Sequence, residues 1–545
     1  MLISRKAMSS RRAASVLLAA AGMVMAVTSW CPHTWAQGEP GAAAFTWDTV
    51  DPAYADRQAW ARQRVLIMQV LGGQQGFEPN RAAVDGWYRK NLFAEFGSRD
   101  GLGDLPEIRE AIYEGLTLSA RNPGLHQFLV DLAYEEATKR VTGNYHPAVK
   151  YNALLIIGDL NQTESGMEGT AKTPPVRLAR ALDFLVEELK KPNQLDALRL
   201  AAMVGIKRHV QLSRQRPADA PIPDARKLEI ITLAQAMMNE KTPPTGRTPD
   251  GHAWLRGRAI ELLAAAGAVG DNLAIFNGIV AVLDDADAPL SLRCTAARAL
   301  QQLDYTGVTG IDPVAIGQRL AALAVFACRN EDERVKEEKK LGLDFSAPGT
   351  SGYPGSGYPG SGYPGGFGGP PGGYGGSDGG ESSDPYGGGG YPGSGYPGGG
   401  AGEKPAAKKE APVPEPIQRV RRRLKEPLKC VLLGLRGETR RSTIGGAASG
   451  APALEGLVAL APADPAKDQV QKLVTAVEAI VTATDTFDKG LDDMMKGIRS
   501  KARELESLLP KPAEETEESS EDDALPGGTA PAKSPPAEKD GATKN

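Results

Sequence analysis

Four stretches of the chain share one residue pattern, and this pattern constrains the fold more than any other feature. Each begins with Leu or Val followed by Arg or Lys, has Ala three places after the basic residue, and ends with Leu or Ile four places later. The blocks are Val149-Lys150…Ala153…Ile157, Leu198-Arg199…Ala202…Ile206, Leu255-Arg256…Ala259…Leu263 and Leu292-Arg293…Ala296…Leu300. Spacings of three and four residues place the apolar members on one face of a helix. We therefore expect repeated helical units that bury this face by stacking on one another.

An apolar helical segment precedes each block, so each unit is predicted to be a hairpin of two helices. These first helices are expected at residues 125–141, 176–190, 227–238 and 273–283. Polar or proline-rich insertions at 163–175 and 241–251 would lie at an edge of the stack. Residues 37–120 are predicted to form an N-terminal helical cap, with helices at 53–71, 80–96 and 104–119. The repeats then occupy residues 121–341.

The blocks resemble HEAT repeats, paired-helix units related to the armadillo class. The second helix of those repeats often begins Pro-x-x-Val-Arg and continues with alanine and Ala-Leu. The fourth block matches closely, with Pro289, Leu292-Arg293, Ala296-Ala297 and Ala299-Leu300, and the first block matches less fully. The resemblance covers residues 125–303 and implies an all-α fold, a right-handed α-α superhelix. We interpret the recurring Arg or Lys as a structural tie to carbonyls or carboxylates between neighbouring units.

A glycine-rich segment interrupts the helical pattern after residue 341. Residues 342–414 contain three consecutive Ser-Gly-Tyr-Pro-Gly pentads and are predicted to be disordered, because so much glycine costs too much conformational entropy to order. Residues 313–340 look like another first helix, and helical patterns resume at 417–424 and 428–435. We expect these segments to form a fifth hairpin with an expanded connection, the alternative being an interdomain linker.

A heptad pattern runs through residues 470–509, within a C-terminal helical module at 415–510. Apolar residues recur every seven positions from Val470 and again from Leu473, which are the a and d positions of a long amphipathic helix. The neighbouring e positions are mostly apolar, which favours packing in a bundle or in the stack over a simple parallel dimer. Association of several chains into an oligomer through this helix is kept as an alternative. Residues 511–545 are predicted to be a disordered acidic tail.

The first 36 residues have the pattern of a secretory signal peptide. Basic residues at 5, 6, 11 and 12 precede an uncharged run from Ala13 to Val27, and small residues flank Trp35 ahead of a cleavage site after Ala36. We therefore expect an exported protein, periplasmic or extracellular, with a retained anchor as the alternative. The leader has four basic and no acidic residues, so its removal takes the formal net charge from −4 to −8. This charge argues against a general nucleic-acid binder.

The chain carries few residues suited to metal or nucleophilic chemistry. Its histidines past the leader, at 126, 146, 209 and 252, lack the spacing of a zinc site, and we expect no metal and no cofactor. A Gly-x-Ser-x-Gly match at 375–379 lies in the glycine tract without the strand and helix that a nucleophile elbow requires. We predict no catalytic residues. Cys294, Cys328 and Cys430 are expected in the core, the alternative being a Cys294–Cys328 disulfide.

One basic run is the candidate binding site that the sequence offers. Arg419, Arg421, Arg422, Arg423 and Lys425 lie close together, and we expect them to contact an anionic envelope polymer, a lipid surface or the acidic tail of the same chain. The alternative is a solvated helix face without a partner. Specific nucleic-acid binding is not expected.

Together these patterns predict a non-enzymatic scaffold or adaptor. Stacked repeats expose long surfaces, which suits protein partners better than catalysis. The main alternative is a structural envelope or surface-layer component that self-associates through the glycine-rich segment. A hydrolase with an unrecognised site is the weaker alternative.

Overall fold

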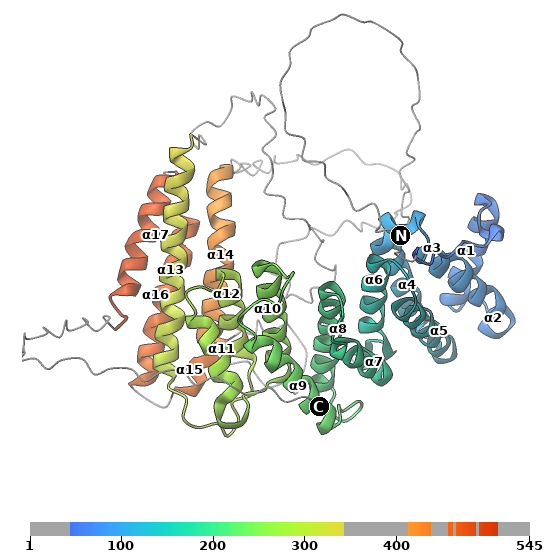
Figure 1. Ribbon diagram of the computed structural model, residues 1–545, viewed down its shortest axis with the longest axis horizontal. Helices are drawn as coiled ribbons and strands as arrows, with labels where there is room; N and C mark the ends of the chain where they lie inside the picture. The colour runs from blue at the N-terminus through green and yellow to red at the C-terminus, as the bar shows by residue number, and fades with distance from the viewer. Residues whose placement is uncertain are drawn as a thin grey trace, which may run out of the picture.

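The structure is a computed structural model that describes residues 44–168, 171–342, 413–437, 456–461, 465–486 and 490–510. The predicted signal peptide, nearly all of the predicted Gly/Tyr/Pro-rich segment and the predicted acidic tail lie outside these residues. The described chain is mostly helical, which confirms the all-α prediction (Figure 1). Among its helices, none is long and apolar enough to span a membrane.

The N-terminal region is a set of helices that packs on the first hairpin. The cap predicted at 37–120 is described from residue 44, and its predicted helices are present with small shifts in their bounds. Its elements are η1 (Pro52–Tyr54), α1 (Arg57–Leu71), α2 (Phe77–Gly86), η2 (Trp87–Leu92), α3 (Phe93–Phe96), η3 (Asp100–Asp104) and α4 (Leu105–Ser119). Helix α4 contacts both helices of the hairpin that follows.

Helix hairpins follow one another along the rest of the described chain. The bounds of the hairpin helices are α5 (Pro123–Thr142) and α6 (Pro147–Asp159), α7 (Ala179–Lys190) and α8 (Asp196–Gln215), α9 (Asp224–Asn239) and α10 (Pro249–Ala266), α11 (Ala274–Asp284) and α12 (Leu290–Ala299), with the short helices η4 (Asp271–Leu273) and η5 (Leu300–Gln302). The second helices contact one another in series, α6 with α8, α8 with α10, and α10 with α12. Helices α8 and α10 therefore each contact the second helix of the hairpin before and of the hairpin after their own.

All twelve apolar members of the four blocks are buried, each with at most 3% of its surface exposed. A close backbone contact lies between α6 and α8, where a Cβ atom placed on Gly158 or on Gly205 would lie 2.8 Å from the Cα of the other glycine. Glycine is needed at both positions because the two backbones meet there. The recurring pattern is thus the face by which successive hairpins pack.

The recurring arginines donate hydrogen bonds to carbonyls at the end of a preceding helix. Arg199 Nη2 donates to the Pro192 carbonyl (2.6 Å), Arg256 Nε to that of Met238 (3.0 Å) and Arg293 Nε to that of Leu283 (2.9 Å). These carbonyls belong to the first helix of the same hairpin or to the residues just after it. The predicted tie between neighbouring units is therefore wrong for these arginines, since the ties lie within each unit. A basic side chain suits this position because helix C-termini leave carbonyls unpaired and carry partial negative charge.

The fifth hairpin predicted from the sequence is present. Helix α13 (Pro313–Lys340) packs on α14 (Glu415–Arg436), and α14 also packs on α12, as a second helix should. A Cβ atom on Gly434 of α14 would lie 2.7 Å from the Ala297 carbonyl oxygen of α12. The two halves of this hairpin come together although 74 residues separate Lys340 from Glu415 in the sequence.

The prediction of one long heptad helix at 470–509 is wrong, because the segment forms two helices. Helix α16 (Ala466–Asp485) ends before Gly490, whose φ of 103° favours glycine and does not continue a helix, and α17 (Leu491–Glu506) follows. These helices pack on each other and on α13, with α16 also on α14 and the short α15 (Gly456–Leu460) nearby. Most heptad a and d positions are thereby buried inside the chain.

The connection between α6 and α7, which includes the predicted insertion at 163–175, contains the strands of the described chain. Strands β1 (Asn161–Thr163) and β4 (Val176–Arg177) pair antiparallel, and β2 (Gly166–Glu168) pairs antiparallel with β3 (Ala171–Thr173). Both strand pairs lie between α6 and α7 in the sequence, and α6 still contacts α7 and α8.

Removing the donor of one helix-end hydrogen bond should destabilise the fold. We expect Arg256→Met to lower the free energy of unfolding by about 1.5–3 kcal/mol, the usual contribution of a charged hydrogen bond, because the buried Met238 carbonyl loses its donor. Arg319→Met, which removes an exposed ion pair with Asp284, should cost at most about 1 kcal/mol. Urea unfolding followed by circular dichroism measures both. Equal midpoints for the two variants would contradict the role of Arg256.

Two helical glycines should respond to alanine with opposite signs. Gly205→Ala places its Cβ against the backbone of Gly158, so we expect a loss of about 1–3 kcal/mol from overpacking. At Gly257 the nearest atom to a new Cβ is 3.7 Å away, so Gly257→Ala should gain up to about 1 kcal/mol in helix propensity. Thermal unfolding of the two variants measures the difference, and a stabilised Gly205→Ala variant would refute the close contact.

Candidate functional site

A row of polar and aromatic side chains crosses one face of the second helices. On α10 it consists of Trp254, Arg258 and Glu261, whose spacing of four and three residues places them on the helix face opposite the buried block. Trp254 is 49% exposed, and the Arg258 guanidinium lies 5.7 Å from its ring centroid. The indole is thus held against a cation while about half of its surface stays open to solvent.

Ion pairs join this row across four helices. Glu261 accepts from Lys207 Nζ of α8 (2.9 Å), Arg258 Nη1 of α10 (2.8 Å) and Arg298 Nη2 of α12 (3.0 Å). Arg298 Nη1 also lies 3.6 Å from Glu426 Oε1 of α14. We call the set Lys207, Trp254, Arg258, Glu261, Arg298 and Glu426 the second-helix row.

The electrostatics of the row favour an anionic ligand. Burial raises the pKa of Glu261, but the positive charges of Lys207, Arg258 and Arg298 outweigh it and leave the pKa below its ordinary value. Glu261 therefore stays ionised, and three cations share this one central carboxylate. Together with the exposed indole they offer hydrogen-bond donors and an apolar surface, which is the chemistry of a binding surface.

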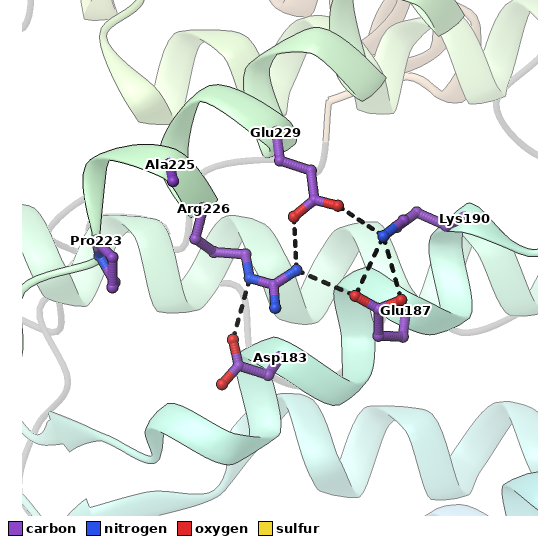
Figure 2. Close-up of a pocket in the computed structure, with 7 residues that line it drawn as sticks. All are labelled: Asp183, Glu187, Lys190, Pro223, Ala225, Arg226 and Glu229. Atoms are coloured by element: carbon purple, nitrogen blue, oxygen red, sulfur yellow. Dashed lines mark hydrogen bonds and ion pairs between the residues drawn. The ribbon is translucent and has the colours of Figure 1, made fainter.

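A pocket between α7 and α9 is lined by paired charges (Figure 2). Arg226 lies 3.1 Å from both Asp183 and Glu187 and 2.6 Å from Glu229, while Lys190 lies 2.7 Å from Glu229 and 3.2 Å from Glu187. A hydrogen bond from Lys190 lowers the pKa of Glu229, although its burial opposes this. With their charges satisfied by one another, these side chains join two neighbouring hairpins.

One serine and histidine pair in the described chain has the contact that a nucleophile and its base would need. Ser119 Oγ lies 3.2 Å from His126 Nδ1, but both atoms also lie within hydrogen-bond distance of the Leu116 carbonyl, at 2.8 Å and 3.2 Å. Both residues are buried. A hydroxyl that is tied to the backbone and closed to solvent does not serve as a nucleophile for a substrate.

The structure does not bring the five residues of the predicted basic site onto one surface. Arg423 turns toward α13, 2.7 Å from both Glu331 and Glu338, and Arg421 pairs with Asp485 of α16. Arg422 pairs with Glu415 of its own helix at 2.7 Å. Arg419 is half-buried and Lys425 is exposed.

These directions diverge because consecutive residues of a helix point about 100° apart. Arg423 is chiefly an internal tie between α13 and α14. Burial raises the pKa of Glu331, and the neighbouring Arg423 only partly offsets this effect. The hydrogen bond from Arg423, with a further contribution from the charge of Arg419, lowers the pKa of Glu338. The predicted site is thus divided between internal ties and solvent.

Sequence reasoning did not find the second-helix row. The available signal was its register, since Trp254, Arg258 and Glu261 stand one residue before, three after and six after the first leucine of their block. Ser291, Thr295 and Arg298 occupy the same positions in the next block. Only the packing shows that Lys207, Glu261 and Arg298 meet across three helices.

No family model, curated protein or solved structure matches this chain. The interpretation of the second-helix row therefore rests on its geometry and chemistry.

Replacing Arg422 and Arg423 of α14 one at a time should show which of them stabilises the fold and which carries only a solvated charge. We expect Arg423→Gln to lower the free energy of unfolding by about 3 kcal/mol, because it leaves buried Glu331 without its partner. Arg422→Gln should change it by less than about 1 kcal/mol, since the Arg422 side chain is 67% exposed. Urea unfolding at pH 7 compares the two. Equal stability of both variants would mean that Arg423 does not hold α14 on α13.

Proposed function

We propose that this protein is an exported, non-enzymatic scaffold that binds a protein partner along its second-helix row. The observation that carries the proposal is Trp254, a large indole that is 49% exposed and lies beside Arg258, in a row that holds three cations and two carboxylates. Tryptophan and arginine are the residues that contribute most to binding energy at protein interfaces. Their presence on one continuous face supports an interaction surface.

We further propose that the hairpins form a right-handed α-α superhelix of the HEAT type. Support comes from the serial contacts of the second helices, the buried blocks and the repeated arginine hydrogen bonds. Units that contact only their neighbours generate an extended surface at little cost in folding. The second-helix row runs across four such units, so one bound ligand would contact several hairpins at once.

The chemistry of the row indicates the kind of segment that would bind. Cationic groups of Lys207, Arg258 and Arg298 would pair with carboxylates, while Trp254 would cover an apolar or aromatic side chain. A peptide segment that alternates acidic and apolar residues offers both. Because Glu261 competes for the same cations, we expect moderate affinity that weakens as salt concentration rises.

The alternatives have less support among the described residues. Self-association through the glycine-rich segment rests on residues outside the described part of the chain, and the hydrolase alternative gains nothing from the buried Ser119–His126 pair. The predicted export rests on the signal-peptide pattern of residues 1–36.

Two exposed aromatic residues provide a matched test. Trp254 and Phe326 are 49% and 42% exposed, and each has an arginine guanidinium near its ring. Trp254→Ala should reduce partner binding at least 10-fold, as expected for an interface hot spot worth about 2 kcal/mol, whereas Phe326→Ala on α13 should not.

The measurement is affinity capture from an envelope extract with quantitative mass spectrometry, followed by calorimetry with the purified partner. Circular dichroism verifies that both variants are folded. A partner retained equally by the two variants would place the interface elsewhere.

A further inference from the structure

Cys294 and Cys430 lie together in the contact between α12 and α14. Both side chains are buried, and Cys294 is close enough to Cys430 to raise the pKa of that thiol. They come from helices that are separated along the chain by α13 and its long connection. Cys328 of α13 is also buried, and burial, with the nearby charge of Glu331, raises its pKa to about 12. All three cysteines are unbridged in the structure.

The two helices approach closely next to this pair. Gly434 lies one turn after Cys430, and a Cβ atom placed on it would lie 2.7 Å from the carbonyl oxygen of Ala297, three residues after Cys294. Packed helices with axes about 8 Å apart bring facing Cα atoms within roughly 4.4–6.8 Å, the separation that a disulfide spans. The backbones of α12 and α14 thus approach closely within one turn of the cysteine pair.

A polar group stands at the edge of this otherwise apolar contact. Cys430 Sγ donates to Glu426 Oε1 at 3.6 Å, and the same carboxylate oxygen lies 3.6 Å from Arg298 Nη1. The Cys294 side chain and burial both raise the pKa of Cys430. Because thiolate is the reactive form, the closed pair reacts slowly with an external disulfide. Oxidation is therefore expected while α14 is docking on α12.

We propose that Cys294 and Cys430 form a disulfide that links α12 to α14 when the chain folds in an oxidising compartment. Two S–H bonds are lost and one S–S bond forms, and an exogenous protein or small-molecule disulfide takes up the two electrons and two protons as it is reduced to two thiols. The proposal uses the proposed export only as the source of that oxidant, since the geometry of the pair does not depend on it. It replaces the Cys294–Cys328 pairing considered from the sequence.

Peptide mapping of the full chain tests the pairing directly. The protein is refolded with a mixture of oxidised and reduced glutathione, alkylated and digested without reduction. We expect a linked pair of peptides that contain Cys294 and Cys430, with Cys328 alkylated. Alkylation at all three positions, or a link from Cys294 to Cys328, would overturn the proposal.

Thermal unfolding with and without reductant gives a second measurement. Reductant should lower the unfolding midpoint of the parent protein and of the Cys328→Ser control by several degrees, and it should leave Cys294→Ser and Cys430→Ser unchanged. If a variant does not fold, the peptide map of the parent protein still decides the question. The proposed scaffold function is measured separately by partner capture, so either proposal can fail alone.

Discussion

The structure depends on the close approach of successive second helices. Where α6 meets α8, Gly158 and Gly205 bring two backbones into contact, and Gly434 does the same for α14 against α12. Small residues at these points let the larger side chains of each block fill the space on either side. Because each hairpin buries its apolar face only against its neighbours, the loss of one contact would expose two faces at once.

Within a hairpin, one arginine couples the two helices. The guanidinium leaves from the first turns of the second helix and reaches carbonyls at the end of the first, so it holds the two helices together. This explains why an arginine stands beside the buried leucine in the second, third and fourth blocks. The first block has Lys150 at this position, a half-buried residue whose burial lowers its pKa.

The helices and the buried face could be predicted because both follow from local spacing, as in the block of Leu255, Ala259 and Leu263. The break at Gly490 could not, since the heptad spacing continues through it and only the packing of α16 on α17 reveals two helices. The candidate site was missed for a related reason. Lys207, Glu261 and Arg298 are far apart in sequence, whereas the basic run at 419–425 is compact in sequence and divided in space.

The fifth hairpin bears on how the length of this chain can change during evolution. Its two helices pack as the other pairs do, although their connection is the longest in the described repeats. Each doubling of a flexible connection adds only about 0.6 kcal/mol to the entropy of closing it. For a connection with the disorder predicted from its sequence, stability would therefore place little constraint on the number of residues between α13 and α14. Pentads could be gained or lost there over evolutionary time while the helices on either side keep their sequence and their contacts.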